Sequence, residues 1–138
     1  MTSEKMQVRL IIEILGRPAE NVREALNTVV VKMGAEKGVK IIEKKYHKPI
    51  PVKDAKDLYT AFAEVLVELD SLANYFGLIF AYLPSNIEII NPEKFSLLSQ
   101  ELNELGHALT QRLHNYDAIA KRLVFERDVL AKRLQEAG

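Results

Sequence analysis

The side chains with the clearest chemical potential lie in the last third of the chain. Glu104 and His107 are three residues apart, so a helix would place them one turn apart on the same face. Four-helix bundles use this Glu-x-x-His spacing to bind iron, with one copy from each of two helices and further glutamates. This chain has one copy, although an antiparallel pair of chains would supply the second. His114 lies two turns, about 10 Å, beyond His107, so the two imidazoles cannot bind one metal ion alone. We predict no metal and no cofactor.

His107, His114 and Asp117 belong to a polar stripe on the expected C-terminal helix, as in the boundary of a protein interface. Cysteine is absent, which excludes disulfides, thiol catalysis and zinc–thiolate sites. There is no glycine-rich phosphate loop, and the serines adjoin predicted helix caps. We therefore expect no enzymatic activity, although a catalytic triad assembled in space would not be visible in the sequence.

Charge is unevenly distributed, although 19 basic and 19 acidic side chains balance over the 138 residues. Eight lysines and three acids fall between Lys32 and Lys56. Such a segment suits RNA or another anion, but lysines also keep an exposed edge strand soluble. The candidate RNA-binding residues are Lys40, Lys44, Lys45 and Lys48.

Hydrophobic periodicity predicts the elements that position these residues. Residues 6–14 alternate as a strand, residues 19–33 have a helical stripe with Gly34 as the C-cap, and residues 39–46 form a second strand. His47 to Pro51 contains two prolines and reads as an extended loop at a sheet edge. Residues 58–82 fit either one helix or a strand followed by a helix, and the cap residues Asp70 and Ser71 favour the second.

Ile87 to Ile90 supplies a fourth strand, and Asn91 and Pro92 are predicted to cap and open a long helix. The order strand, helix, strand, strand, helix, strand gives an α+β, ferredoxin-like βαββαβ sandwich over residues 1–91, followed by a helical arm over 92–138. One sheet face is free of helices and mixes charged with apolar side chains. Such a face suits contact with a partly polar surface, either the sheet of a second protomer or part of the C-terminal helix. We expect this face to carry Arg9, Ile11, Glu13, Lys40, Ile42, Lys44, Phe62, Glu64, Leu66, Glu68 and Ile90.

The predicted arm is longer than the domain before it requires, since some 40 helical residues reach about 60 Å. Its apolar seam has steps of three and four residues, is interrupted by Arg127, and consists of Leu98, Leu102, Leu105, Leu109, Leu113, Tyr116, Ala120, Leu123, Leu130 and Leu134. The step from Leu109 to Leu113 departs from strict heptads, which favours a bundle or packing on a domain surface over a long two-stranded coiled coil. Within this seam, the expected partner-binding residues are Leu113, Tyr116, Ala120, Leu123, Leu130 and Leu134. Asn115 and Asp117 disfavour helix interiors, so a bend or break near Asn115 is an alternative to one continuous helix.

Two resemblances follow from short motifs. The Gly16-Arg17-Pro18 turn, the Tyr82-Leu83-Pro84 ending and the run Ile87 to Glu93 resemble small, uncharacterised archaeal proteins with a ferredoxin-like domain and a helical tail. The turn is also similar to that of ACT-type regulatory domains, in which paired domains bind amino acids near the first strand–helix junction. That resemblance implies Gly16, Arg17 and Pro18 as ligand-binding residues, with Ala19 where the ACT pattern usually has glycine.

The leading hypothesis is a non-enzymatic homo-oligomer whose C-terminal helix mediates self-association and docking to another protein. The alternatives are an RNA- or ribosome-associated factor and an ACT-like sensor of a small ligand. The sequence starts without a signal-peptide pattern and has no apolar run of the about 20 residues that span a bilayer, so we expect a cytoplasmic protein without a membrane partner.

Overall fold

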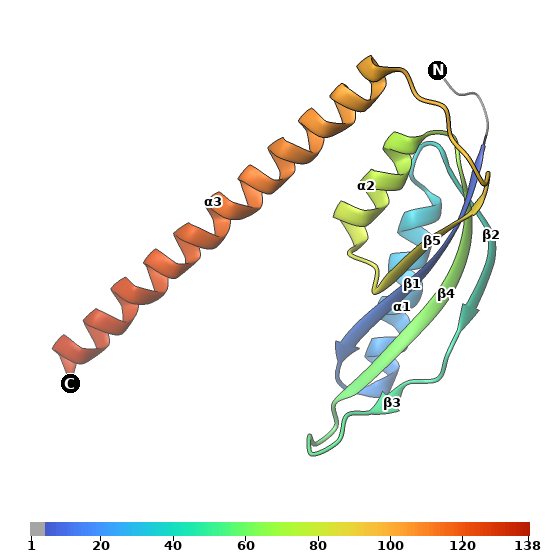
Figure 1. Cartoon of the computed structure of the whole chain (residues 1–138). Coiled ribbons are helices and arrows are strands. Elements are labelled where there is room, and N and C mark those ends of the chain that lie inside the picture. The colour runs from blue at the N-terminus through green and yellow to red at the C-terminus, as the bar shows by residue number, and fades with distance from the viewer. Residues whose placement is uncertain (1–4) are drawn as a thin grey trace. The chain divides into compact units, whose positions relative to one another are not determined.

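The sheet is built around two long antiparallel strands in the computed structural model, which describes residues 5–138. The elements in chain order are β1 (Met6–Gly16), α1 (Ala19–Gly34), β2 (Val39–Tyr46), β3 (Ile50–Pro51), β4 (Tyr59–Leu69), α2 (Leu72–Tyr82), β5 (Asn86–Asn91) and α3 (Ser99–Ala137). β1 and β4 pair along their whole length, and the sheet order is β2-β4-β1-β5, with β3 paired to the start of β4 (Figure 1). The predicted α+β, ferredoxin-like fold with a long C-terminal helix is confirmed.

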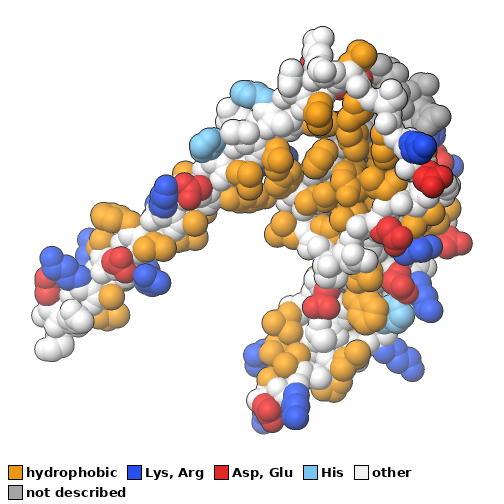
Figure 2. Space-filling model, viewed as in Figure 1, with side chains coloured by type: hydrophobic (Ala, Val, Ile, Leu, Met, Phe, Trp, Pro, Cys, Tyr) orange, Lys and Arg blue, Asp and Glu red, His pale blue; other side chains and the backbone are white. Residues whose placement is uncertain are grey.

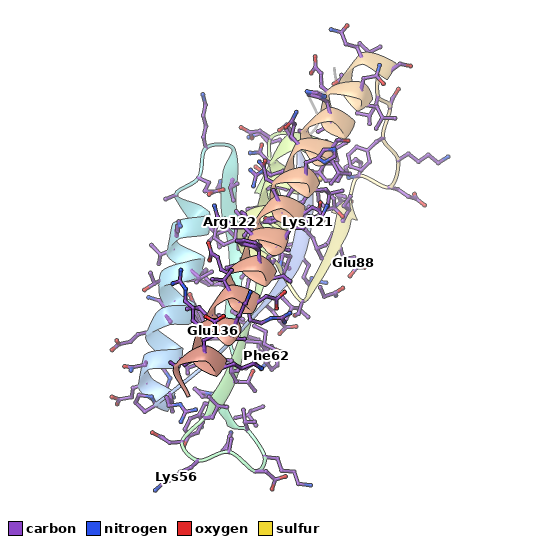
Figure 3. All side chains as sticks on the ribbon, turned by 90° about the vertical axis from the view of Figure 1, so that its left-hand side faces the viewer. Lys56, Phe62, Glu88, Lys121, Arg122 and Glu136 are labelled. Atoms are coloured by element: carbon purple, nitrogen blue, oxygen red, sulfur yellow. The ribbon has the colours of Figure 1, made fainter. Side chains whose placement is uncertain are left out.

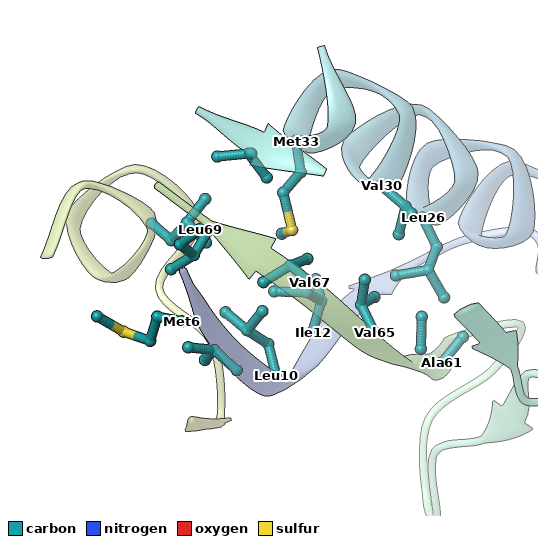
Figure 4. Packing of buried hydrophobic residues seen from close by; sticks show 14 of the residues in the cluster. Met6, Leu10, Ile12, Leu26, Val30, Met33, Ala61, Val65, Val67 and Leu69 are labelled. Atoms are coloured by element: carbon teal, nitrogen blue, oxygen red, sulfur yellow. The ribbon is translucent and has the colours of Figure 1, made fainter. Parts of the chain in front are cut away.

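Both α1 and α2 pack on the same face of the sheet (Figure 1). β4 buries every second side chain, as a period of two requires when one face is covered. α1 contributes Val22, Leu26, Val30 and Met33, whose steps of three and four align them on one side of the helix. Figure 4 shows Leu26, Val30 and Met33 on the side of α1 that faces the sheet. Leu78 is the one fully buried residue of α2. The core therefore lies between the helices and the inner faces of β1 and β4.

The ambiguous stretch from Leu58 to Tyr82 is a strand followed by a helix, as predicted. Ser71 caps α2, because its side chain accepts a hydrogen bond from the Asn74 N–H at 3.2 Å. Leu83 ends the helix in the left-handed region with φ of 45°.

Gly34 is not the C-cap that the sequence suggested. It is the last residue of α1, and Ala35 follows as the C-cap in right-handed conformation. A Cβ at Gly34 would lie 2.9 Å from Cδ1 of Ile41. The glycine therefore permits close approach of α1 to β2.

A bulge at Ile42 corrects the predicted helix-free face. The register shifts between Ile41 and Glu43, so the side chains beyond the bulge change sides. Glu43 and Lys45 then lie on the helix-free face, and Lys44 does not, since it pairs with buried Val65. At the other edge, Glu88 of β5 faces Arg9 across the ladder and joins this face.

The C-terminal helix begins later than expected. Pro92 does not open it, because β5 pairs through Asn91 and a connection follows, in which Phe95 packs against the core. α3 then runs from Ser99 to Ala137 without interruption, so the break considered at Asn115 is absent. Helical hydrogen bonding along the whole length outweighs the poor propensities there.

Contacts divide the described chain into two units, residues 5–96 and Leu97–Gly138. The sequence suggested a boundary after Asn91. Residues 1–4 lie outside the described residues. They belong to the predicted domain and to the start of the sequence, where no signal peptide is expected.

Candidate interaction surface

α3 has local sources of stability along its length. At its start, the Glu101 carboxylate accepts a hydrogen bond from the Leu98 N–H at 3.1 Å, which lowers the pKa of Glu101. Lys121 Nζ lies 2.7 Å from the Asp117 carboxylate, four residues away, and this hydrogen-bonded pair raises the pKa of Lys121. Exposed contacts of this kind stabilise a helix only weakly, so packing normally stabilises a helix of this kind.

The seam of α3 exposes its large apolar side chains to solvent. Leu113 and Leu123 are 55% and 56% exposed, and Leu134 is 74% exposed. Tyr116, Ala120 and Leu130 are exposed as well. The C-terminal unit contains no second helix or strand among the described residues, so it holds no element of its own against which this seam could pack.

Of the polar stripe, the two histidines lie away from the seam, whereas Asp117 flanks it. At 3.6 residues per turn, His107 and His114 project from the side of α3 opposite Leu109 and Tyr116. Side chains project on every side of this helix (Figure 3). Among residues 5–138, no group of three or more His, Asp or Glu side chains is arranged to hold a metal ion.

α2 presents a second apolar surface, in the N-terminal unit. It has no charged residue, and apart from buried Leu78 its large side chains are half-buried. Figure 2 shows hydrophobic side chains gathered over this helix. A helix that is apolar on all sides is usually covered on all sides, so this surface also suits a protein contact.

The helix-free sheet face contains a small polar cluster centred on His47. The His47 and Phe62 rings stack with centroids 4.1 Å apart and an interplanar angle of 19°. His47 Nε2 lies 2.8 Å from a Glu64 carboxylate oxygen, in a hydrogen bond whose donor depends on the imidazole tautomer. This bond, aided by the charges of His47, Lys45 and Arg9, lowers the pKa of Glu64.

Opposite charges alternate across this face. Lys40 pairs in register with Glu68, and Lys45 pairs with Glu64. A hollow of about 440 Å³ lined by Arg9, Glu43, Lys44, Lys45, Glu64, Val65 and Leu66 lies beside these pairs. Of the candidate RNA-binding lysines, Lys40 and Lys45 lie on this face, Lys44 extends toward the Tyr46 ring at 6.0 Å, and Lys48 follows β2. The lysines thus do not combine into a patch of one sign.

The Gly16-Arg17-Pro18 turn joins β1 to α1, as the sequence predicted. Arg17 Nη1 donates a hydrogen bond to the Lys56 carbonyl at 3.5 Å, and the Arg17 carbonyl accepts one from Asn21 at 3.3 Å. A Cβ at Gly16 would lie 3.2 Å from Val22, so the turn is tightly packed against α1. These contacts give Gly16 and Arg17 structural roles in the turn.

A family model matches residues 7–129, which include nearly all of the sheet domain and most of α3. The chain belongs to the MJ0538 family. That description names no ligand, reaction or partner. No curated protein and no solved structure matches the chain.

In this MJ0538 family member, sequence reasoning missed the contacts of the His47 cluster. His47 and Glu64 are 17 residues apart, and only the ladder between β2 and β4 brings them together. The alternation in β4 placed Phe62 and Glu64 on one face, but His47 lies beyond the bulge at Ile42. Phe125 was also missed as an exposed apolar residue outside the seam.

No helix within residues 5–138 of this family member combines the length and apolar character needed to cross a bilayer.

Proposed function

We propose that this protein is a non-enzymatic homo-oligomer in which the seam of α3 mediates self-association and docking to another protein. One observation carries the proposal: among the described residues, a 39-residue helix forms a unit without a second helix or strand, and its apolar seam is exposed. Large exposed apolar stripes are rare on monomeric proteins and commonly mark protein interfaces.

Burial of the seam would give α3 the stability that its surface ion pairs cannot supply. Fully burying one leucine contributes about 1.5–3 kcal/mol, several times the value of an exposed ion pair. Repeated steps of three and four residues are the pattern by which helices pack along a common axis. A second helix is therefore a better partner for this seam than a small molecule.

Two neighbouring substitutions test the role of the seam. Leu123 lies in the seam and Phe125 lies on the other side of α3, and both are exposed, at 56% and 68%. Light scattering should give a multiple of the chain mass for the unmodified protein and for Phe125→Glu. Leu123→Glu should shift the protein toward the monomer mass, because a carboxylate in a packed seam is costly to desolvate.

Both variants introduce a glutamate into the same helix. Circular dichroism should therefore report equal helix content for the two variants whenever they have the same oligomeric state. Dissociation by Phe125→Glu alone, or a monomeric unmodified chain, would overturn the proposal. Loss of assembly in both variants would extend the interface around α3, as in a bundle of three or more helices.

We further expect a cytoplasmic setting, and relatives among small archaeal proteins with the same two-part organisation. The mixed charges of the sheet face are compatible with a protein partner, since protein interfaces commonly have polar rims.

A further inference from the structure

We propose that α3 pairs with α3 of a second copy of the chain in antiparallel orientation, with Ala118 at the two-fold axis. The inference rests on the proposed function, because it requires that the seam mediates self-association. It adds the identity of the partner helix, its direction and its alignment.

Most seam positions of α3 have a counterpart at an equal distance on the other side of the middle of the helix, except Leu105 and Leu130. Ala118 is the central residue of Ser99–Ala137. An antiparallel pair that overlaps fully brings together residues at equal distances on either side of Ala118. Leu102 then lies opposite Leu134, and Leu113 lies opposite Leu123. Leu105 and Leu130 lie opposite the small residues Ala131 and Gly106. The central part of the seam and its two end positions are therefore complementary to the reversed copy.

Side-chain size also favours this alignment near the axis. Tyr116 and Ala120 are each two residues from Ala118, so the large ring of one copy faces the small side chain of the other. Pairing of large with small residues is how facing helices fill space without voids. A parallel pair in register would instead place Tyr116 against Tyr116 and Ala120 against Ala120.

Arg127 separates the two orientations most clearly. It occupies a seam position, between Leu123 and Leu130, and its guanidinium lies 3.3 Å from the Asp128 carboxylate. A parallel pair would bring both copies of Arg127 together in the seam, where two like charges would be desolvated. The antiparallel pair places each Arg127 opposite Leu109, which its aliphatic stem can cover while the charge stays in water.

The charges of α3 are polarised along its length. Residues 99–117 carry three acids and Arg112, a formal charge of −2, whereas residues 119–137 carry five basic and three acidic side chains, a formal charge of +2. Antiparallel pairing places each half against the half of opposite sign, and parallel pairing places like against like. Complementary charge is a common determinant of helix orientation.

Individual flanking charges agree with this direction. Arg112 and Glu126 lie on the same side of the seam, and the antiparallel alignment brings Arg112 near Glu126 of the second copy, twice per pair. The two copies of Asp117 also approach the axis. In each chain, Lys121 Nζ lies 2.7 Å from the Asp117 carboxylate of the same chain and offsets the repulsion between the two carboxylates. A parallel pair gains an Arg112–Asp117 contact but keeps the two Arg127 side chains in the seam.

Disulfide trapping tests the orientation cleanly, because the chain has no cysteine. The two variants are Leu102→Cys and Leu134→Cys, both at exposed positions. In the antiparallel pair, the two copies of residue 134 are separated by 32 helical residues, about 50 Å, whereas disulfide formation needs Cα atoms within about 7 Å. Oxidation of an equimolar mixture should therefore give a mixed disulfide, and each variant alone should give almost none.

Because both positions belong to the seam, light scattering under reducing conditions first identifies a protein concentration at which each variant is oligomeric. An oligomer in which each variant links to itself would be parallel and would overturn this inference while leaving the proposed function in place. An oligomer without any linkage would exclude pairing along this seam. A monomeric unmodified chain would overturn the proposed function itself, so the failures are distinct.

Discussion

At the scale of single residues, the His47–Phe62–Glu64 cluster is the most specific polar feature of the sheet. The imidazole is held on two sides, by a stacked ring at 4.1 Å and a carboxylate oxygen at 2.8 Å. Its backbone N–H also donates to the Phe62 carbonyl at 3.0 Å, which continues the ladder beyond β2. The cluster therefore fixes the end of β2 against β4.

The lowered pKa of Glu64 predicts a pH-dependent contribution to stability. A carboxyl whose pKa is lower in the folded state than its ordinary value of 4.5 stabilises the fold above that pH, and the contribution is lost as pH falls through the folded-state pKa. Glu64→Gln should thus lower the free energy of unfolding at pH 7, and the difference from the unmodified protein should shrink below about pH 4.5. Urea unfolding followed by circular dichroism at pH 7 and pH 3.5 measures both values.

Glu24→Gln, at an exposed position of α1 beyond its first turn, is the matched control and should not reproduce this profile. A Glu64→Gln effect of equal size at both pH values would contradict the assignment, because a purely steric effect does not depend on protonation.

At the scale of elements, two helical glycines should respond in opposite ways to alanine. Alanine is favoured over glycine inside a helix by about 1 kcal/mol. Gly77 of α2 has open space where a Cβ would lie, so Gly77→Ala should stabilise the fold by about 0.5–1 kcal/mol. Gly34→Ala should lose this gain or destabilise the fold, because its Cβ would lie 2.9 Å from Ile41 Cδ1. Thermal unfolding of the two variants measures the difference.

Removing the obstructing methyl provides the control. In a protein that already carries Ile41→Val, Gly34→Ala should therefore be less destabilising than it is in the unmodified protein. Equal stabilisation by both alanine substitutions would show that Ile41 moves aside at little cost and that close packing does not require Gly34.

The order of the longer elements was predictable because most of them have a distinct hydrophobic period. The short strand β3 was not predicted, because it lies in the segment whose two prolines suggested a loop. The division of residues 58–82 was decided by Ser71, whose capping role is local and visible in sequence. The bulge at Ile42 was not predictable, because it depends on how β2 meets β4 rather than on its own pattern. Pro92 is favourable at a helix start, but pairing of Asn91 with Gln7 extends β5 to that point instead.

The candidate surface was predictable to a similar extent. Helical spacing identified the seam residues of α3 without knowledge of a partner, because their period is local. The lysine-rich segment was less informative, because the number of lysines in the sequence does not indicate on which face of the sheet each side chain lies. Lys44 and Lys45 separate to opposite sides of β2, and acids across the ladder face Lys40 and Lys45.

At the scale of the whole molecule, the fully buried core and the exposed seam belong to different parts of the chain. Every residue of the buried core lies between Met6 and Leu78, and Phe95 is the last residue packed against it. A chain ending at Ser96 should consequently keep its fold while losing the seam. The full chain should then differ from it in assembly more than in domain structure.

This separation predicts how thermal stability depends on protein concentration. Association of folded chains stabilises them by mass action, so the Tm of the full chain should rise with concentration. The Tm of the chain ending at Ser96 should be independent of concentration, with a monomeric mass in light scattering. Full-length Leu123→Glu should behave like the shortened chain, since it retains α3 but disrupts the seam. If the shortened chain keeps the oligomeric mass, the contact lies in the N-terminal unit, where the helix-free sheet face and α2 are the available surfaces.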